Sequence, residues 1–263
     1  MQWEQELAVA IAAARAAGAI VRDVYGRPFA VRQKSADNPV TEADLRANDC
    51  IQRAITTAFP GDGWLSEETA DSSDRLAKRR VWIIDPLDGT KEFTQHIPEF
   101  CVCIALVDAG APVVGVSYNP VTDELFATAR GLGLHVNGVP ARTSTCADLA
   151  SARVLASRSE DQRGEWEQYK PLMRVEPTGS VALKLALIAA GRADATFSLT
   201  PKNEWDICAG AALVEGGGGR ITDCHGQPLR FNRETPLLPG LIASNVPLYD
   251  RLRSVIATVE ATG

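Results

Sequence analysis

The sequence lacks any hydrophobic run near the roughly 20 residues that a helix needs to span a bilayer. Its first 26 residues are amphipathic and carry charges at Glu4, Glu6, Arg15 and Arg22. A signal peptide would instead begin with basic residues and continue into a short apolar core. We therefore expect a cytoplasmic protein without a membrane span.

Histidine is scarce, and the cysteines show no metal-binding pattern. The three histidines (His96, His135 and His225) are scattered, and the six cysteines include no C-x-x-C pair. These features exclude a recognisable zinc site and make a histidine-based nucleophile relay unexpected. Cys101 and Cys103 lie two apart in an expected strand and are interpreted as packed thiols.

An excess of positive charge is also missing. The chain has 27 Lys and Arg residues against 33 Asp and Glu residues, a net charge of −6. A broad nucleic-acid surface needs clustered Lys and Arg, so we expect no nucleic acid polymer as partner. A small anionic substrate stays possible because metal ions can supply positive charge locally.

What is present is an ordinary globular composition with periodic patterns along 263 residues. The polar segment 35–40 is expected to be a loop. Strands in the first half of the chain are expected to pair mainly antiparallel, and the second half is expected to form a layer of alternating strands and helices. Apolar spacing predicts helices over residues 2–25, 42–58, 180–190, 207–215 and 248–259, and strands over residues 28–34, 81–84, 100–107, 113–118, 124–129, 153–156, 195–199, 220–222 and 241–243.

The most informative stretch runs from residue 81 to residue 93. An apolar, β-favouring run ends at Asp85, and Asp88 follows three residues later, before Gly89 and Thr90. Two carboxylates on such a turn repel each other unless a cation lies between them, and oxygen ligands suit Mg²⁺. The backbone N–H groups of Gly89 and Thr90 could bind phosphate where a helix begins. The working hypothesis is a Mg²⁺-dependent phosphatase.

Each candidate acid also has an ordinary structural interpretation. Asp85 and Asp88 could cap a helix, and Asp206 could be the N-cap of the helix that follows it. Glu67 and Glu68 could be an exposed acidic pair. Asp44 is expected at the third position of a helix capped by Thr41, and the glycines at 216–219 are interpreted as a helix stop.

Taken together, these residues resemble the inositol monophosphatase-like superfamily of Mg²⁺-dependent, lithium-sensitive phosphatases. The resemblance spans nearly the whole chain and rests on three motifs in order, Ser66-Glu67-Glu68, Asp85 to Thr90, and Trp205-Asp206. It implies a layered αβαβα sandwich. An N-terminal lobe at 1–148 would carry most metal ligands, and a C-terminal lobe at 149–263 would supply Asp206 and substrate contacts.

The resemblance also implies roles for individual residues at a site with two to three Mg²⁺ ions. Thr90, paired with Asp44, would orient and deprotonate the attacking water, and Glu68 would support the site. Substrate contacts would come from Gly89, Thr90, Lys91, Gly179 and Ser180. The implied metal ligands are Glu67, Asp85, the Leu87 carbonyl, Asp88 and Asp206.

Within the superfamily, the chain looks most similar to bacterial 3′(2′),5′-bisphosphate nucleotidases of the CysQ type. The signs are segments 38–44, 88–93, 157–159 and 201–206. Inositol monophosphatases usually have a Glu seven residues before the Trp-Asp aspartate, where this chain has Leu199. The implied activity is hydrolysis of the 3′-phosphate of adenosine 3′,5′-bisphosphate in sulfate assimilation, by a monomer or homodimer.

Three alternatives remain open at this point. A sister enzyme on the same fold could act on inositol, fructose or histidinol phosphates. An aspartyl-phosphate phosphatase would use Asp-x-Asp, whereas Asp85 and Asp88 are separated by two residues. A metal-dependent nucleotide sensor built on an inactive phosphatase would be the non-enzymatic case.

Overall fold

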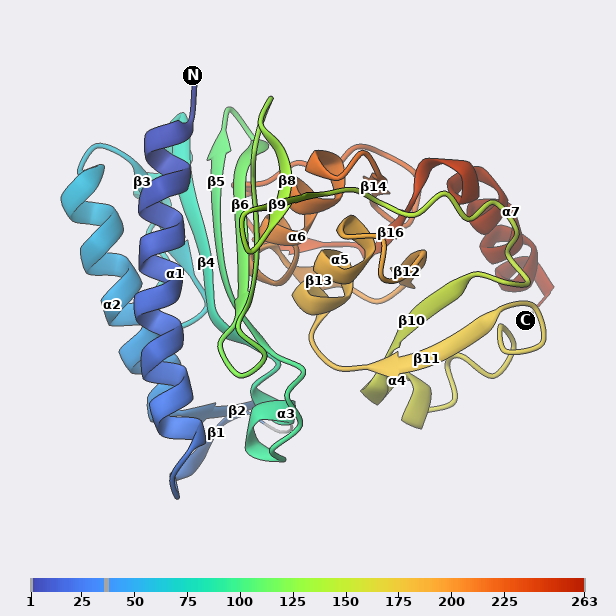
Figure 1. The fold of residues 1–263 in the computed structure, drawn as a ribbon, viewed down its shortest axis with the longest axis horizontal. Coiled ribbons are helices and arrows are strands. Elements are labelled where there is room, and N and C mark those ends of the chain that lie inside the picture. The colour runs from blue at the N-terminus through green and yellow to red at the C-terminus, as the bar shows by residue number, and fades with distance from the viewer. Residues whose placement is uncertain (1, 36–37, 263) are drawn as a thin grey trace.

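The computed structural model describes residues 2–35 and 38–262, and its elements stack in five layers (Figure 1). Two helices cover the outer face of a seven-stranded sheet, and two more helices lie between that sheet and a second, five-stranded one. A C-terminal helix covers the far side of the second sheet. This is the predicted αβαβα arrangement.

The outer layer consists of α1 (Glu4–Tyr25) and α2 (Glu42–Ala58), close to the predicted bounds. The face of α1 toward the sheet is built largely from alanines, among them Ala10, Ala14 and Ala17, all fully buried. Small side chains let two helices approach the sheet closely, and burial of this face supplies the hydrophobic stabilisation.

The segment expected to be a loop before α2 is partly a strand. β1 (Val31–Ser35) pairs antiparallel with β2 (Asn38–Thr41), with Gln33 opposite Pro39. Proline is tolerated here because a two-stranded ribbon has only edge strands, where a missing N–H leaves no partner unpaired. The prediction of a loop over 35–40 was therefore wrong for Ser35 and from Asn38 onward, and its residues 36–37 lie outside the described part of the chain.

The seven-stranded sheet runs in the order β3-β4-β5-β6-β7-β8-β9. β3 and β4 are parallel, and every later neighbour pair is antiparallel. Cys101 and Cys103 face the central helices within the apolar core, as packed thiols should. The strands are β3 (Gly63–Ser66), β4 (Arg80–Asp88), β5 (Cys101–Asp108), β6 (Ala111–Asn119), β7 (Glu124–Ala129), β8 (Gly133–Val136) and β9 (Val139–Ala141).

The central layer holds α5 (Val181–Ala189) and α6 (Glu204–Gly216), both almost wholly buried. α6 packs directly on β6 at Gly115, where an added Cβ would lie 2.6 Å from the Ala209 carbonyl oxygen and 2.6 Å from the Ala212 Cβ. The helix ends at Gly216, with Gly217 as its C-cap, so the glycine run is the predicted helix stop. This close packing fixes the height of α6 above the sheet.

The second sheet has the order β11-β10-β12-β16-β14 and mixes parallel with antiparallel pairs. α7 (Val246–Thr262) covers its outer face. β11, η1, α4, β13 and β15 were not predicted, because few apolar residues mark them. The remaining elements are η1 (Ser73–Ala77), α3 (Thr90–Thr94), β10 (Arg153–Ser157), α4 (Arg158–Gln162), β11 (Arg174–Thr178), β12 (Ala195–Ser198), β13 (Lys202–Asn203), β14 (Arg220–Thr222), β15 (Leu237–Leu238) and β16 (Leu241–Ser244).

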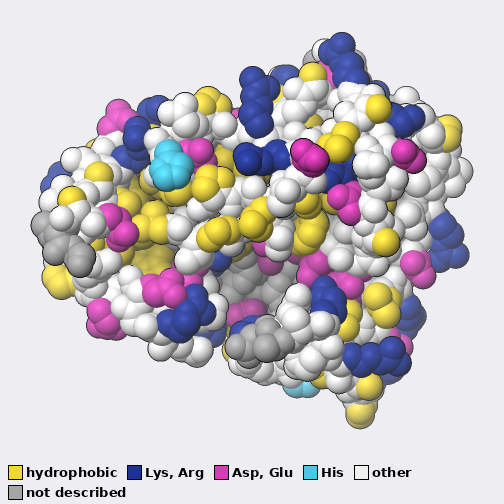
Figure 2. Space-filling view, turned by 180° about the vertical axis from the view of Figure 1, so that it is seen from behind, with side chains coloured by type: hydrophobic (Ala, Val, Ile, Leu, Met, Phe, Trp, Pro, Cys, Tyr) yellow, Lys and Arg dark blue, Asp and Glu magenta, His cyan; other side chains and the backbone are white. Residues whose placement is uncertain are grey.

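Two features of the structure concern the expected absence of a nucleic acid surface and of a membrane span. Basic and acidic side chains are interspersed over the face shown in Figure 2. Within residues 2–35 and 38–262, no helix has the length and apolarity needed to cross a membrane. The candidate functional site is the cleft where the end of β4 meets the central helices.

Candidate active site and metal centre

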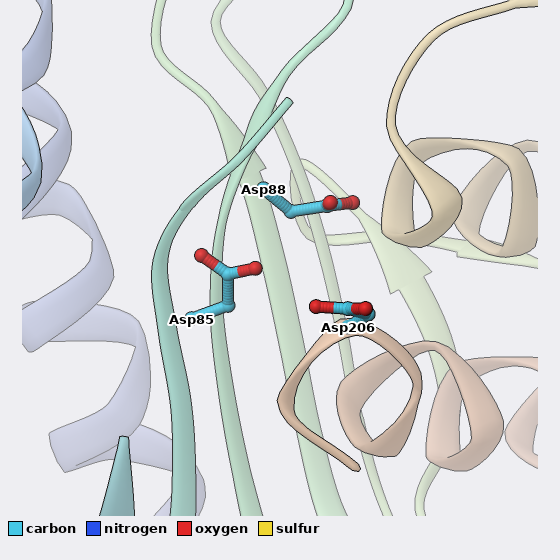
Figure 3. Close-up of side chains that lie close together, drawn as sticks. All are labelled: Asp85, Asp88 and Asp206. Atoms are coloured by element: carbon cyan, nitrogen blue, oxygen red, sulfur yellow. The ribbon is translucent and has the colours of Figure 1, made fainter. Parts of the chain in front are cut away.

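Three carboxylates from distant parts of the chain converge where β4 ends and α6 begins. One oxygen from each of Asp85, Asp88 and Asp206 lies within 4.8 Å of the others (Figure 3). Asp85 and Asp88 come from β4, and Asp206 comes from the first turn of α6. The geometry therefore joins the two motifs that the sequence placed about 120 residues apart.

An irregularity in β4 turns both of its aspartates toward the same space. Residues three apart in a regular strand point to opposite faces. Here Asp85 pairs with Cys103 and Asp88 with Cys101, and the register shifts between the two pairs. An extra residue of this kind bends a strand and redirects its side chains. The strand thus extends to Asp88, four residues beyond the apolar run at 81–84 that predicted it.

Asp206 lies one turn further into its helix than expected. The N-cap of α6 is Asn203, and Asp206 occupies the third helical position, where its Oδ2 accepts a hydrogen bond from the Asn203 N–H at 3.3 Å. The expectation that Asp206 caps the helix was therefore wrong. The helix begins at Glu204, whose buried carboxylate accepts the N–H groups of Asn232 and Arg233.

The electrostatics of this cluster call for a cation. Burial raises the pKa of Asp85 and Asp206 well above the ordinary range, and the neighbouring carboxylates raise both pKa values further. Burial also raises the pKa of Asp88, although hydrogen bonds from Ser180 and Ala182 oppose this. Among the described residues, no Lys or Arg forms an ion pair with any of the three. An all-oxygen donor set that is not ion-paired to a described Lys or Arg fits Mg²⁺.

A hydroxyl–carboxylate pair lies beside the cluster. Thr90 Oγ is 2.9 Å from Asp44 Oδ1 and 3.0 Å from the Leu87 carbonyl oxygen. Asp44 is only 1% exposed, and its Oδ2 accepts hydrogen bonds from the backbone N–H and the hydroxyl of Thr41. The capping box predicted for α2 is present, and it fixes the Asp44 carboxylate against Thr90.

Glu67 and Glu68 are placed differently from the three aspartates. Lys34 Nζ lies 2.6 Å from Glu67 Oε1 and 2.6 Å from Glu68 Oε1. Glu67 lines the cleft, whereas the largely buried Glu68 side chain lies behind it. The exposed-pair interpretation is therefore wrong for both, since the side chains of Glu67 and Glu68 are 20% and 4% exposed. Sequence reasoning missed Lys34, which lies in the exposed strand β1 and carries no motif.

The cleft itself has a volume of about 350 Å³ and brings together most of the predicted site residues. Gly179 and Ser180 line it, but their polar groups engage the protein: the Gly179 N–H donates to Glu99 Oε2 at 2.6 Å, and Ser180 Oγ donates to Asp88 Oδ2 at 2.5 Å. The predicted site residues on its wall are Glu67, Asp85, Leu87, Asp88, Gly89, Thr90, Lys91, Gly179, Ser180 and Asp206.

Lys184 lines the cleft and was also missed by sequence reasoning. It lies in α5, is 4% exposed, and its Nζ is 3.4 Å from the Thr178 carbonyl oxygen. Burial lowers its pKa to about 8, against the opposing pull of Glu160 and Asp88. The available signal was one lysine inside an otherwise apolar helix, a position where a charge is rarely buried without a role.

A buried cluster of carboxylates, a hydroxyl paired with a carboxylate and an open polar cleft define a metal-dependent phosphoryl hydrolase. The sequence matches the inositol monophosphatase family over residues 2–261. The chain therefore belongs to the inositol monophosphatase family and is a phosphatase acting on small phosphorylated substrates.

Its relatives carry more than one substrate name. The chain is 35% identical over 235 residues to inositol monophosphatase 3 of Solanum lycopersicum, covering 85% of this chain and 87% of the relative. It is also 35% identical over 237 residues to the 3′(2′),5′-bisphosphate nucleotidase CysQ of Escherichia coli (strain K12), covering 88% and 96%. The solved inositol monophosphatase of Anabaena superposes with a TM-score of 0.85 at 31% identity, covering 98% of this chain and 97% of that chain.

Proposed function

We propose that this phosphatase hydrolyses the 3′-phosphate of adenosine 3′,5′-bisphosphate, giving AMP and phosphate. The observation that carries the substrate choice is Leu199, which packs against the apolar cluster of the second sheet. It stands where inositol phosphatases are expected to offer a carboxylate to an inositol hydroxyl. An apolar side chain there gives such a hydroxyl no acceptor.

Lys184 supports a substrate that carries a second phosphate. Its buried ammonium lines the same cleft as the aspartates, and its one hydrogen bond to a described residue is a long contact to a carbonyl oxygen. A charge-assisted hydrogen bond to a phosphate would compensate the desolvated cation. Lys91 lines the cleft as well and is a further proposed phosphate contact.

Asp85, Asp88 and Asp206 would hold Mg²⁺, with Glu67 and the Leu87 carbonyl as further ligands for two to three ions in all. When bound, Mg²⁺ supplies Lewis acidity and positive charge for the phosphoryl oxygens. The backbone N–H groups of Gly89 and Thr90 would share in binding those oxygens.

Thr90 and Asp44 would move the proton of the attacking water. The Thr90 hydroxyl has one proton, and both of its neighbours, Asp44 Oδ1 and the Leu87 carbonyl, are acceptors. Its proton therefore points toward one of them, and a lone pair remains to accept the proton of the water. Asp44 would take up the proton that Thr90 releases, and Glu68 would support the site from behind the cleft.

The deciding experiment is a phosphate-release panel with Mg²⁺, repeated with added Li⁺. The substrates are adenosine 3′,5′-bisphosphate, 3′-phosphoadenylyl sulfate, 3′-AMP and inositol, fructose and histidinol phosphates. We expect the highest kcat/KM for the bisphosphate nucleotide, inhibition by Li⁺ and a role in sulfate assimilation in the cytoplasm. A higher kcat/KM for inositol phosphate would overturn the substrate assignment and favour the activity named for the tomato relative.

A matched pair of lysine variants tests the second-phosphate contact. Lys184→Met should raise KM for adenosine 3′,5′-bisphosphate at least about tenfold, the effect of losing one charge-assisted hydrogen bond. KM for 3′-AMP, which has a single phosphate, should change much less. Lys78→Met, at an exposed lysine outside the cleft, should leave both KM values at the parent level.

A further inference from the structure

Ser180 adopts a backbone conformation that serine rarely occupies. Its φ of 55° and ψ of 118° place it in a region that favours glycine, at the N-cap of α5. Such strain persists only where the surrounding structure holds it, and it gathers at functional sites. The side chain is therefore expected to do something that glycine, the relaxed choice, could not.

The hydroxyl of Ser180 joins the start of α5 to a carboxylate of the metal cluster. Its Oγ donates to Asp88 Oδ2 at 2.5 Å and accepts the Leu183 N–H at 2.9 Å. The Ala182 N–H donates to the same Asp88 Oδ2 at 2.7 Å. Both donors thus fall on one oxygen of Asp88, and Oδ1 is left free of them.

We propose that Ser180 is a positioning residue for Asp88. It holds one carboxylate oxygen of Asp88 so that the group keeps its orientation toward Asp85 and Asp206. The hydroxyl has one proton, which goes to Asp88, and one of its lone pairs is engaged by Leu183. This assignment replaces the substrate contact that the family resemblance implied for Ser180. It rests on the metal dependence of the family and not on the nucleotide substrate.

The test separates the hydroxyl from the strain with Ser180→Gly and Ser180→Ala. Ser180→Gly removes both, whereas Ser180→Ala removes the hydroxyl and keeps the strain. Mn²⁺ binding is measured by electron paramagnetic resonance without substrate, and thermal unfolding is measured without metal. Ala109→Gly is the matched control, because Ala109 has a φ of 50° in the turn beside Asp108, which pairs with Arg80 at the other end of β4.

Both Ser180 variants should bind Mn²⁺ about tenfold more weakly, the usual effect of removing a group that orients a metal ligand. Ser180→Gly should unfold at a higher temperature than Ser180→Ala, because only the glycine variant relieves the strain. Ala109→Gly should unfold at or above the parent temperature with unchanged Mn²⁺ affinity. Mn²⁺ affinity within twofold of the parent in Ser180→Gly would overturn the proposal.

Two further measurements separate positioning from a substrate contact. For Ser180→Gly, the Mg²⁺ concentration needed for half-maximal activity should rise, while the substrate KM at saturating Mg²⁺ stays near the parent value. A raised KM with an unchanged Mg²⁺ requirement would assign Ser180 to the substrate instead. In an Asp88→Asn background, Ser180→Gly should weaken Mn²⁺ binding by less than twofold, and an undiminished tenfold loss there would contradict action through Asp88.

Discussion

The first turns of α2 and α6 use the same local device for different purposes. Asp44 and Asp206 each occupy the third position of a helix, and each accepts the backbone N–H of the N-cap residue, Thr41 or Asn203. Asp44 is also hydrogen-bonded by the Thr41 hydroxyl and by Thr90. From the described residues Asp206 accepts one hydrogen bond, at 3.3 Å, and it faces Asp85 and Asp88.

The difference shows how surroundings decide what a carboxylate does. Burial raises the pKa of Asp44, but hydrogen bonds from the neutral donors Thr41 and Thr90 oppose this shift and fix the carboxylate as the partner of Thr90. Asp206 is buried beside other acids, and hydrogen bonds from the described residues compensate it far less. Such a group is costly until a cation arrives. A helix-capping motif therefore becomes either a proton acceptor or a metal ligand according to the next layer of contacts.

The largest effect is expected from Asp206→Asn. Loss of a ligand charge should lower kcat/KM by about a thousandfold, since a metal ion supplies several kcal/mol to the transition state. The metal-free protein should be more stable than the parent at pH 7, because one of three mutually repelling charges is gone. Phosphate release and thermal unfolding with and without Mg²⁺ measure both. Asp250→Asn, at an exposed acid, is the control, and parent-like activity in Asp206→Asn would remove Asp206 from the metal centre.

Asp44→Asn should have the next largest effect, with a different signature. Its amide can no longer accept the proton of Thr90 as a carboxylate does, so kcat should fall about a hundredfold. Lost hydrogen bonds to a buried charge should destabilise the protein by about 2 kcal/mol. Mn²⁺ affinity should stay near the parent value. A large loss of Mn²⁺ affinity would instead place Asp44 among the ligands and erase its contrast with Asp206.

The first turns of α5 carry a lysine, Lys184, where α2 and α6 carry an aspartate. This lysine predicts a pH dependence of the free energy of unfolding. Burial lowers the pKa of Lys184 to about 8 from an ordinary 10.5, with Glu160, Asp88 and Glu92 opposing and Lys202 reinforcing the shift. Between these values the unfolded chain keeps a proton that the folded chain has lost, so this lysine adds stability as pH rises. Chemical denaturation from pH 7 to 10.5 should show the parent gaining about 3 kcal/mol relative to Lys184→Met. Parallel pH profiles would contradict a buried, titrating Lys184.

The smallest effect is expected at Glu67 and Glu68, which already pair with the Lys34 ammonium. Lys34→Met removes the ammonium from Glu67 and Glu68, so added Mg²⁺ no longer competes with it. The Mg²⁺ concentration for half-maximal activity should fall about two- to fivefold, the scale of a partly exposed ion pair. Lys78→Met again serves as the control. A higher Mg²⁺ requirement would mean that Lys34 organises the site and does not compete for it.

Much of the architecture was predictable because its signals are local. The alanine-rich helix at 4–25, the strand ending in two aspartates and the capping box at Thr41 each follow from spacing and turn chemistry within a few residues. The meeting of Asp85 and Asp88 with Asp206 came only from the family resemblance. No periodicity within one chain encodes a contact between residues about 120 positions apart.

The remaining features depend on contacts that no local pattern carries. The strand at Asn38–Thr41 forms because β1 pairs with it, against the turn tendency of Pro39. The Ser180 hydroxyl at the start of α5 donates to Asp88, which lies far away in the sequence at the end of β4 in the seven-stranded sheet. Lys34 and Lys184 acquire importance from the acids that the fold brings near them. Tertiary contact overrides propensity at each of these positions.

The packing of α6 on Gly115 has a consequence for how this enzyme can vary. A side chain at position 115 would push against the helix that carries Asp206, although Gly115 is not among the residues that line the cleft. We therefore expect glycine at position 115 to be retained as strictly as the aspartates of the metal centre, although it takes no part in the chemistry. A screen for inactive variants should recover substitutions at Gly115 alongside those at the aspartates, and lineages that change substrate should do so without altering it.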